Sequence, residues 1–227
     1  MGALWQDFMS NNDEIIDKWR HYFPVYERHL DPWVDRSVTM LEIGVSKGGS
    51  LKMWQRYLGP YARIIGIDID TQCAKYEAPG INVRIGDQSD PTFLQGLIDE
   101  FGVPDIVLDD GSHHMAHVKA TFEFLYPRLG RDAVYMVEDL HTGYLEEYGG
   151  GTYSENNFFI YARQGIDQMN KHWSREAVPV NPIFDDTRSV CIYDSLVVFE
   201  KGLPPVLGAH QVGRRGLTAN LRSRHLL

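Results

Sequence analysis

Short apolar runs alternate along the chain with stretches whose apolar residues recur at helical spacing. The runs predict five short buried strands, and the helical patterns fall between them. The predicted strands cover residues 38–43, 63–67, 81–85, 106–108 and 133–137, and the helices cover residues 51–58, 93–101 and 115–126. This alternation is typical of an α/β fold with a doubly wound, Rossmann-like sheet that is mostly parallel and binds ligands at the carboxyl ends of its strands.

The N-terminal region precedes any strand signal. Residues 5–30 carry large apolar side chains at helical spacing, with Asn12 or Asp13 as the N-cap. This pattern predicts an N-terminal helical arm over residues 1–36. The arm either covers a ligand cleft, forms a subunit contact or packs against the flank of the domain.

The C-terminal region returns to strands after one more helical pattern at residues 158–173. Two apolar segments at residues 189–193 and 195–199 predict a terminal antiparallel hairpin. We therefore expect the α/β domain to cover residues 37–205 and a C-terminal tail to cover residues 206–227.

Composition narrows the class of protein. The chain has 227 residues, 43% of them hydrophobic, and a formal net charge of −9 at pH 7. These values favour a globular fold and disfavour a nucleic-acid partner. Two cysteines, Cys73 and Cys191, are too few and too far apart for a disulfide framework or a zinc site. With no secretory leader and no apolar run of about 18 residues, we expect a cytoplasmic protein without a membrane contact.

A glycine-containing loop joins the first predicted strand to the first helix. Gly44 and Gly48 let a ligand approach the backbone closely, and Ser50 is placed to cap the helix. Strand, glycine loop and helix are the parts of a nucleotide site. The spacing Gly-x-x-x-Gly nevertheless fits neither the dinucleotide motif nor the P-loop, so the loop alone is a weak signal.

Polar residues follow the second and third predicted strands. Asp68 is placed to accept hydrogen bonds from both hydroxyls of a ribose, although it or Asp70 could instead cap the helix that begins near Thr71. After the third strand, Asp87 and Gln88 offer acceptor and donor groups to the edge of an adenine.

The stretch 106–114 is an apolar strand that ends in two carboxylates and two imidazoles. Asp109 and Asp110 end this strand, and Glu138 and Asp139 end the next one. Neighbouring strands lie about 4.8 Å apart, so these acids would repel one another if left unpaired. A hard cation such as Mg²⁺ resolves that conflict, because it prefers oxygen ligands. The alternative is that the acids are solvated and cap the helices that follow.

Taken together, these motifs resemble those of the metal-dependent class I S-adenosylmethionine O-methyltransferases that modify sugars on natural products, such as the mycinamicin and rhamnosyl O-methyltransferases. The resemblance covers about residues 38 to 202. Its specific part is the pair of motifs Asp109-Asp110-Gly-Ser-His113-His114 and Glu138-Asp139-Leu-His141. The larger members have an extra N-terminal domain where this chain has only its arm, so the resemblance leaves the substrate and the assembly open, although we expect a homo-oligomer.

The resemblance implies a role for each group of residues. Gly44, Asp68 and Asp87 would contact the methionine, ribose and adenine portions of S-adenosylmethionine. The full cofactor set that we assign is Glu42, Gly44, Ser46, Gly48, Ser50, Asp68, Asp87, Gln88 and Asp109. The implied magnesium ligands are Asp110, Glu138 and Asp139, and the implied general base is His113.

A mechanism follows from these charges. A metal that chelates two adjacent hydroxyls lowers the pKa of the one to be methylated, His113 accepts its proton, and the oxygen attacks the sulfonium methyl in line. His141, a second catalytic candidate, and His114 either orient substrate or serve a structural role. His117 is expected only on the helix after the site.

The predicted function is therefore Mg²⁺-dependent transfer of a methyl group to a sugar hydroxyl of a small-molecule glycoside. The alternatives are a related tailoring enzyme, of the catechol O-methyltransferase or cephalosporin hydroxylase type, or a cofactor-binding protein without turnover.

Overall fold

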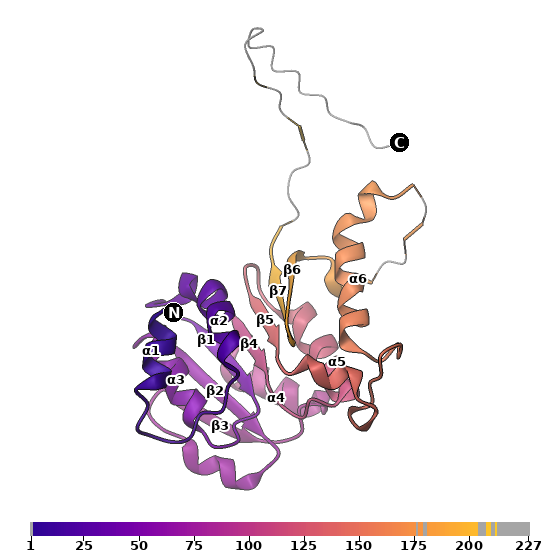
Figure 1. Ribbon diagram of the computed structural model, residues 1–227. Coiled ribbons are helices and arrows are strands. Elements are labelled where there is room, and N and C mark those ends of the chain that lie inside the picture. Colours follow the sequence, from indigo (N-terminus) through magenta and orange to yellow (C-terminus); the bar gives the residue numbers. More distant parts are fainter. Residues whose placement is uncertain (1, 176, 179–180, 204–207, 210–211, 213–227) are drawn as a thin grey trace.

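One mixed sheet forms the centre of the molecule (Figure 1). The computed structural model describes residues 2–175, 177–178, 181–203, 208–209 and 212. Within them, the strand order is β3-β2-β1-β4-β5-β7-β6. The strands are β1 (Thr39–Ile43), β2 (Arg63–Asp68), β3 (Ile81–Ile85), β4 (Ile106–Asp109), β5 (Val134–Val137), β6 (Thr187–Tyr193) and β7 (Leu196–Lys201). Strands β1 to β5 are parallel, and β7 is antiparallel to β5 and β6, which confirms the predicted sheet and its C-terminal hairpin.

Six α-helices of the described residues cover the two faces of the sheet. They are α1 (Ala3–Met9), α2 (Phe23–Leu30), α3 (Gly49–Leu58), α4 (Pro91–Phe101), α5 (Met115–Leu125) and α6 (Phe158–Asn170). Helices α1 to α3 pack on one face, and α4 to α6 pack on the other. Short 3-10 helices lie at Arg20–Tyr22, Asp31–Trp33, Thr71–Tyr76, Tyr126–Arg128, Leu140–Tyr144, Glu146–Tyr148, Lys171–Trp173 and Pro182–Phe184.

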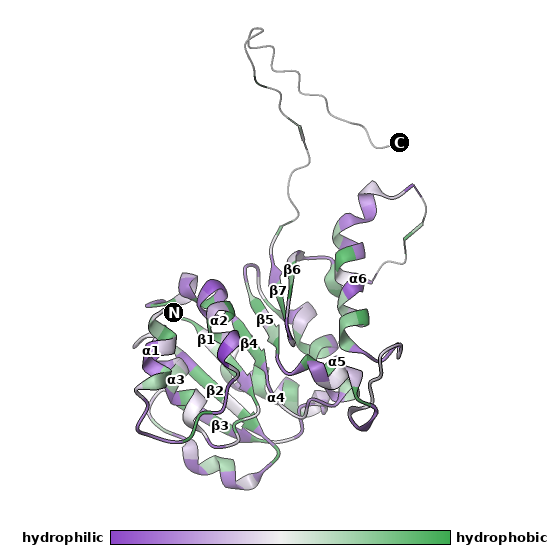
Figure 2. Cartoon of the chain, viewed as in Figure 1, coloured by the Kyte–Doolittle hydropathy of each residue, from purple (hydrophilic) through white to green (hydrophobic). Residues whose placement is uncertain are grey.

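The strands are hydrophobic along most of their length because both of their faces are covered (Figure 2). Side chains alternate between the faces, so Met40 of β1 packs under α1 to α3 while Leu41 and Ile43 pack under α4 to α6. Glu42 breaks this apolar run and is fully buried. A buried acid in a central strand needs partners, and those partners belong to the site described below.

The N-terminal arm is helical, as predicted, but its helices are separated by a non-helical segment. Helix α1 ends at Met9, residues 10–19 are not helical, and the chain resumes with a 3-10 turn and α2. The interruption begins at Ser10-Asn11-Asn12-Asp13, whose short polar side chains bond to nearby backbone: Asn11 donates to the carbonyl of Glu14 and Asn12 to that of Ser10. Neither Asn12 nor Asp13 caps a helix.

No helix in the described part of the chain is long and apolar enough to cross a membrane. Most of the C-terminal tail predicted for residues 206–227 lies outside the described residues.

Candidate active site

The acids that follow β4 and β5 meet at one edge of the sheet. Because the two strands are parallel and Asp109 lies opposite Val137, Asp110 and Glu138 leave the sheet side by side. Asp139 follows in a left-handed conformation with φ of 53°, which turns the chain sharply. The fold therefore brings the carboxylates of Asp110, Glu138 and Asp139 together, as we predicted from their positions at the strand ends.

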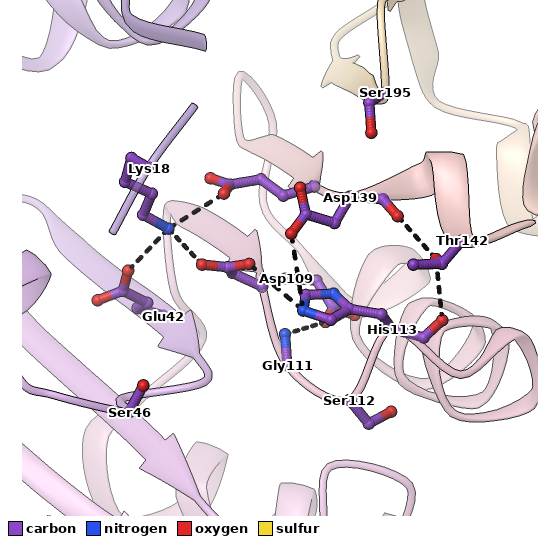
Figure 3. A network of polar contacts seen from close by, with 12 residues as sticks. Lys18, Glu42, Ser46, Asp109, Gly111, Ser112, His113, Asp139, Thr142 and Ser195 are labelled. Carbon is purple, nitrogen blue, oxygen red and sulfur yellow. Dashed lines mark hydrogen bonds and ion pairs between the residues drawn. The ribbon is translucent and has the colours of Figure 1, made fainter. Parts of the chain in front are cut away.

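A lysine from the N-terminal region neutralises part of this cluster (Figure 3). The Nζ of Lys18 lies 2.5 Å from Asp110 Oδ2, 3.1 Å from Glu138 Oε2 and 3.5 Å from Glu42 Oε1, and the side chain is 2% exposed. Burial by itself lowers the pKa of Lys18, but the charges of Asp110, Glu138 and Glu42 outweigh it and hold that pKa well above its usual value. Lys18 is therefore a buried ammonium ion bound by three acids.

Two tyrosines hold the acids from the same side of the molecule. The hydroxyl of Tyr26 donates to Glu138 Oε1 at 2.5 Å, and that of Tyr22 donates to Asp139 Oδ1 at 2.8 Å. Burial raises the pKa of Glu138, while the charge of Lys18 opposes the shift. Both oxygens of Glu138 are consequently engaged by donors of the chain itself.

Three potential metal-ligand atoms lie close together in the same site. One atom each from Asp110, His113 and Asp139 falls within 4.8 Å of the others, which is close enough for one metal ion. The Nε2 of His113 lies 3.9 Å from Asp110 Oδ1 and 3.8 Å from Asp139 Oδ2. His113 adopts φ of 57°, which turns its ring back toward these acids (Figure 3).

The glycine loop presses directly against the end of β4. Gly44 has φ of 95°, and a Cβ there would lie 2.1 Å from the carbonyl oxygen of Asp110. Asp68 accepts hydrogen bonds from the backbone amides of Val45 and Ser46, both at 2.9 Å. Asp68 therefore fixes the loop that faces the cavity.

The predicted helix cap at Ser50 is wrong. The N-cap residue of α3 is Gly48, which has no side chain to bond the helix, and the Ser50 hydroxyl donates instead to Glu42 Oε2 at 2.8 Å. Trp54 donates to Glu42 Oε1 at 3.0 Å. The Ser50 hydroxyl thus satisfies the buried carboxylate of Glu42. Leaving that carboxylate without a donor would cost more free energy than the missing side-chain cap of α3.

The polar residues after β3 divide between two roles. Asp87 accepts hydrogen bonds from the amide and hydroxyl of Ser89. Gln88 is buried: its Nε2 donates to Asp109 Oδ1 at 3.1 Å, and its Oε1 accepts from the amide of Ser112 at 2.8 Å. Burial raises the pKa of Asp109 to about 7. The Gln88 side chain therefore holds the loop after β4, which was not predicted.

Two adjoining cavities run along the carboxyl edge of the strands. The first, of about 430 Å³, is lined by residues 15–19, the glycine loop and the acidic cluster. The second, of about 200 Å³, is lined by Asp87, Gln88 and His117. Gly44, Asp68 and Gly111 line both. Together they suit an elongated ligand of ordinary cofactor size.

Most of the residues singled out in the sequence lie on these walls. Ser46, Ser50, Asp110, His113, Glu138 and Asp139 line the first cavity in addition to the shared residues. Four others line neither cavity: Glu42, Gly48, Asp109 and His141.

The remaining histidines differ in their surroundings. His141 is tied to Ser195, whose Oγ lies 2.7 Å from its Nδ1, and the ring of Trp19 packs edge-on against it at 6.1 Å. His114 occupies the N-cap position of α5. His117, expected only on the helix after the site, in fact lines the second cavity.

Sequence reasoning missed three of the groups that shape the acidic cluster: Lys18, Tyr22 and Tyr26. They recur every four residues, which would place them on one face of a helix. That spacing could have indicated that their polar groups act together, but we interpreted it only as part of the apolar pattern of the predicted arm.

Comparisons with known proteins agree with this geometry. The chain is 36% identical over 197 residues to 8-demethyl-8-alpha-L-rhamnosyl tetracenomycin-C 2'-O-methyltransferase of Streptomyces olivaceus, a match that spans 82% of this chain and 52% of the relative. It is 38% identical over 140 residues to mycinamicin VI 2''-O-methyltransferase of Micromonospora griseorubida, which spans 57% of this chain and 34% of the relative. The chain is similar to sugar O-methyltransferases of antibiotic pathways.

A solved methyltransferase structure is similar to this chain over most of its length. The MycE methyltransferase of the mycinamycin biosynthetic pathway, in complex with Mg, SAH and mycinamycin VI, matches with a TM-score of 0.78 and 26% identity. The match covers 95% of this chain and 57% of that structure. The resemblance seen in the sequence is thereby confirmed, and the fold is that of the class I S-adenosylmethionine methyltransferases.

Two further findings delimit the relationship to these sugar O-methyltransferases. The matches to three curated relatives cover most of this chain, but the chain spans only about half the length of those relatives. It matches no protein-family model.

Proposed function

We propose that the chain is an S-adenosylmethionine-dependent, Mg²⁺-dependent O-methyltransferase that acts on a sugar hydroxyl of a glycosylated natural product. The observation that carries this proposal is that the two cavities adjoin at Gly44, Asp68 and Gly111 while the acidic cluster lines the first, so a cofactor in the joined cavities would bring its methyl group to a hydroxyl chelated at the cluster. The names of the relatives, and the Mg and SAH in the related structure, support it.

The acidic cluster fits a magnesium ion. One carboxylate oxygen of Asp110 lies within 4.8 Å of one of Asp139, and hard oxygen ligands are those that Mg²⁺ prefers. Glu138 is the third ligand that the sequence implies, and it lies in the same cavity. When bound there, Mg²⁺ would act as a Lewis acid on an acceptor hydroxyl and lower the pKa of that hydroxyl.

The cofactor would lie along the joined cavities. Gly44 lies beside Asp110 on the wall of the first cavity, where the methionine end would lie next to the acids, and Asp87 lies in the second cavity, where the adenine would sit. Asp68, at the junction, already accepts two amides of the loop, so a ribose would share its remaining capacity.

His113 would act as the general base. Its Nε2 is not hydrogen-bonded to any described residue, is held between Asp110 and Asp139, and faces the first cavity. Asp110 and Asp139 orient the ring and would stabilise the imidazolium that forms when it takes the hydroxyl proton. The exposed side chains of Ile15 and Trp19 on the same cavity wall would contact the acceptor.

Isothermal titration calorimetry tests this proposal. S-adenosylmethionine is titrated first, followed by a panel of glycosides and a catechol, each with and without Mg²⁺. We expect cofactor binding, and Mg²⁺-dependent binding of a glycoside that is lost in Asp110→Asn. The control Asp132→Asn removes an acid that lies in a surface ion pair with Arg188 and should bind like the unaltered chain.

Two results would contradict the proposal. Absence of cofactor binding would remove the methyltransferase assignment, and Mg²⁺-dependent binding of the catechol alone would point to the catechol-type alternative.

A further inference from the structure

Residues 11–19, which we call the strap, cross the rim of the sheet between α1 and the 3-10 turn before α2. Among the described residues, positions 12–18 form no hydrogen bond between backbone groups. Ion pairs hold the strap at two points: Lys18 binds the acidic cluster, and Glu14 lies 2.6 Å from Lys52. Between these points Ile16 packs against the hydrophobic core, and the carbonyl groups of Glu14 and Ile15 lie close to Gly49. The end of the strap over the acidic cluster is therefore attached through the charge of Lys18.

The strap also forms a wall of the first cavity. Residues 15–19 all line it, and the side chains of Ile15 and Trp19 are 67% and 55% exposed. Any displacement of Lys18 would therefore move a wall of the pocket.

The ammonium of Lys18 binds two of the carboxylates that the implied metal site requires. It binds Asp110 Oδ2 and Glu138 Oε2, and the other oxygen of Glu138 accepts a hydrogen bond from Tyr26. Each of these oxygens keeps a second lone pair, so the obstacle to a metal ion is charge and not the hydrogen bonds. A divalent ion on Asp110 or Glu138 would strongly repel the neighbouring ammonium in this buried setting.

We propose that Lys18 is a tethered cation that competes with the divalent metal ion for Asp110 and Glu138, so that metal binding releases the strap from the rim of the sheet. Without metal, the positive charge of Lys18 keeps the acids together. Because the metal displaces Lys18, binding of the metal also opens the cavity wall. This inference rests on the proposed function, because it assumes that the acidic cluster binds a divalent ion.

Calorimetric titration of Mg²⁺ alone, without cofactor or acceptor, tests the competition. Lys18→Met removes the tethered charge and should bind Mg²⁺ about 10-fold more tightly than the unaltered chain, an effect within the usual range for coupled sites. Lys18→Arg keeps the charge and is the matched control, expected to bind Mg²⁺ much more weakly than Lys18→Met. Equal or weaker binding by Lys18→Met would overturn the proposal.

Limited digestion of the unaltered chain with trypsin tests the release of the strap. We expect cleavage after Lys18 to be faster when Mg²⁺ is saturating, while cleavage after Arg28 in α2 is unchanged. Unchanged or slower cleavage after Lys18 would overturn the proposal, and this measurement decides the matter even if Lys18→Met does not fold.

The two proposals fail in different ways. If Mg²⁺ binds all three proteins equally, the role of Lys18 is refuted and the magnesium-dependent function stands. If Mg²⁺ binds none of them, the metal part of the proposed function fails, and this inference fails with it.

Discussion

His113 and His141 occupy different chemical settings although both follow an acidic strand end. The Nε2 of His113 faces the first cavity between two carboxylates, whereas the Nδ1 of His141 is committed to Ser195. Only a ring nitrogen that faces substrate can exchange a proton with it. His113 is accordingly the better candidate for the base, and His141 for a positioning role.

Replacement of each histidine by asparagine separates these roles. Asparagine tolerates the positive φ of His113, so His113→Asn removes the imidazole with little backbone strain. We expect kcat for methyl transfer to fall by about 10²–10⁴-fold, the usual contribution of a general base. His141→Asn serves as the control and should retain most of kcat. An equal loss in both variants would contradict the assignment.

Cys73 gives a pH-dependent probe of the cofactor loop. Its thiol is buried, and its Sγ lies 3.5 Å from the carbonyl oxygen of Ser46. Burial, with the nearby charge of Asp68, raises the pKa of Cys73 to about 11. The thiol is therefore protonated at pH 8, and the reactive thiolate appears only as the pH rises toward 11.

In Cys191→Ser, which leaves Cys73 as the single cysteine, alkylation should speed up about tenfold per pH unit between pH 8 and pH 10, without a plateau. Alkylation reactions quenched at successive times at each pH give this rate directly. A plateau near the ordinary pKa of a free thiol would show that Cys73 reacts from an exposed state.

At the scale of elements, the close approach between the glycine loop and β4 is the contact on which the cofactor site depends. Gly44 and Gly102 both have positive φ, but a Cβ at Gly44 would collide with backbone while one at Gly102 meets open space. The two positions therefore share a positive φ and differ in the collision. This pair allows the steric effect to be measured separately.

Gly102→Ala should lower the free energy of unfolding by about 1–3 kcal/mol, because φ of 85° with ψ of 176° is a conformation that essentially only glycine adopts. Gly44→Ala should lower it further and should abolish binding of S-adenosylmethionine, since the loop must move away from Asp110. Chemical denaturation and calorimetry provide the two measurements. If Gly44→Ala matched Gly102→Ala in both, the close contact would be irrelevant to the site.

The strands and most helices could be predicted from the sequence because their signals are local. The run Ile106–Asp109 is a strand with a polar end, and Pro91 begins a helix that Asp90 caps. The break in the N-terminal arm was not recognised, because the apolar spacing of Trp19, Tyr22 and Tyr26 fits a helix. Polar residues at 10–13 and contacts to distant acids decide the conformation there.

The site was predicted only in part for a related reason. The acids after β4 and β5 could be placed together, since parallel strands end at one edge of a sheet. Lys18 lies far from Asp110 and Glu138 in the sequence, so nothing local indicated that it would neutralise them. The roles of Ser50 and Gln88 likewise depend on buried partners, Glu42 and Asp109, that only the fold brings close.

At the scale of the whole molecule, the sheet brings the parts of one reaction site to a single edge. The glycine loop after β1, the acids after β4 and β5 and the strap all line the first cavity. The proposed cofactor and metal sites are therefore formed by residues of this one chain, which spans about half the length of the curated relatives that it matches.

The measurement that tests this account most directly is transfer of a radiolabelled methyl group from S-adenosylmethionine to glycosylated natural products by the 227-residue chain. We predict labelled glycoside in the presence of Mg²⁺, none in the presence of a chelator, and recovery when Mg²⁺ is restored. Transfer that persists in the chelator would contradict the role of the acidic cluster. Binding of the cofactor with no transfer to any glycoside would contradict the proposed reaction.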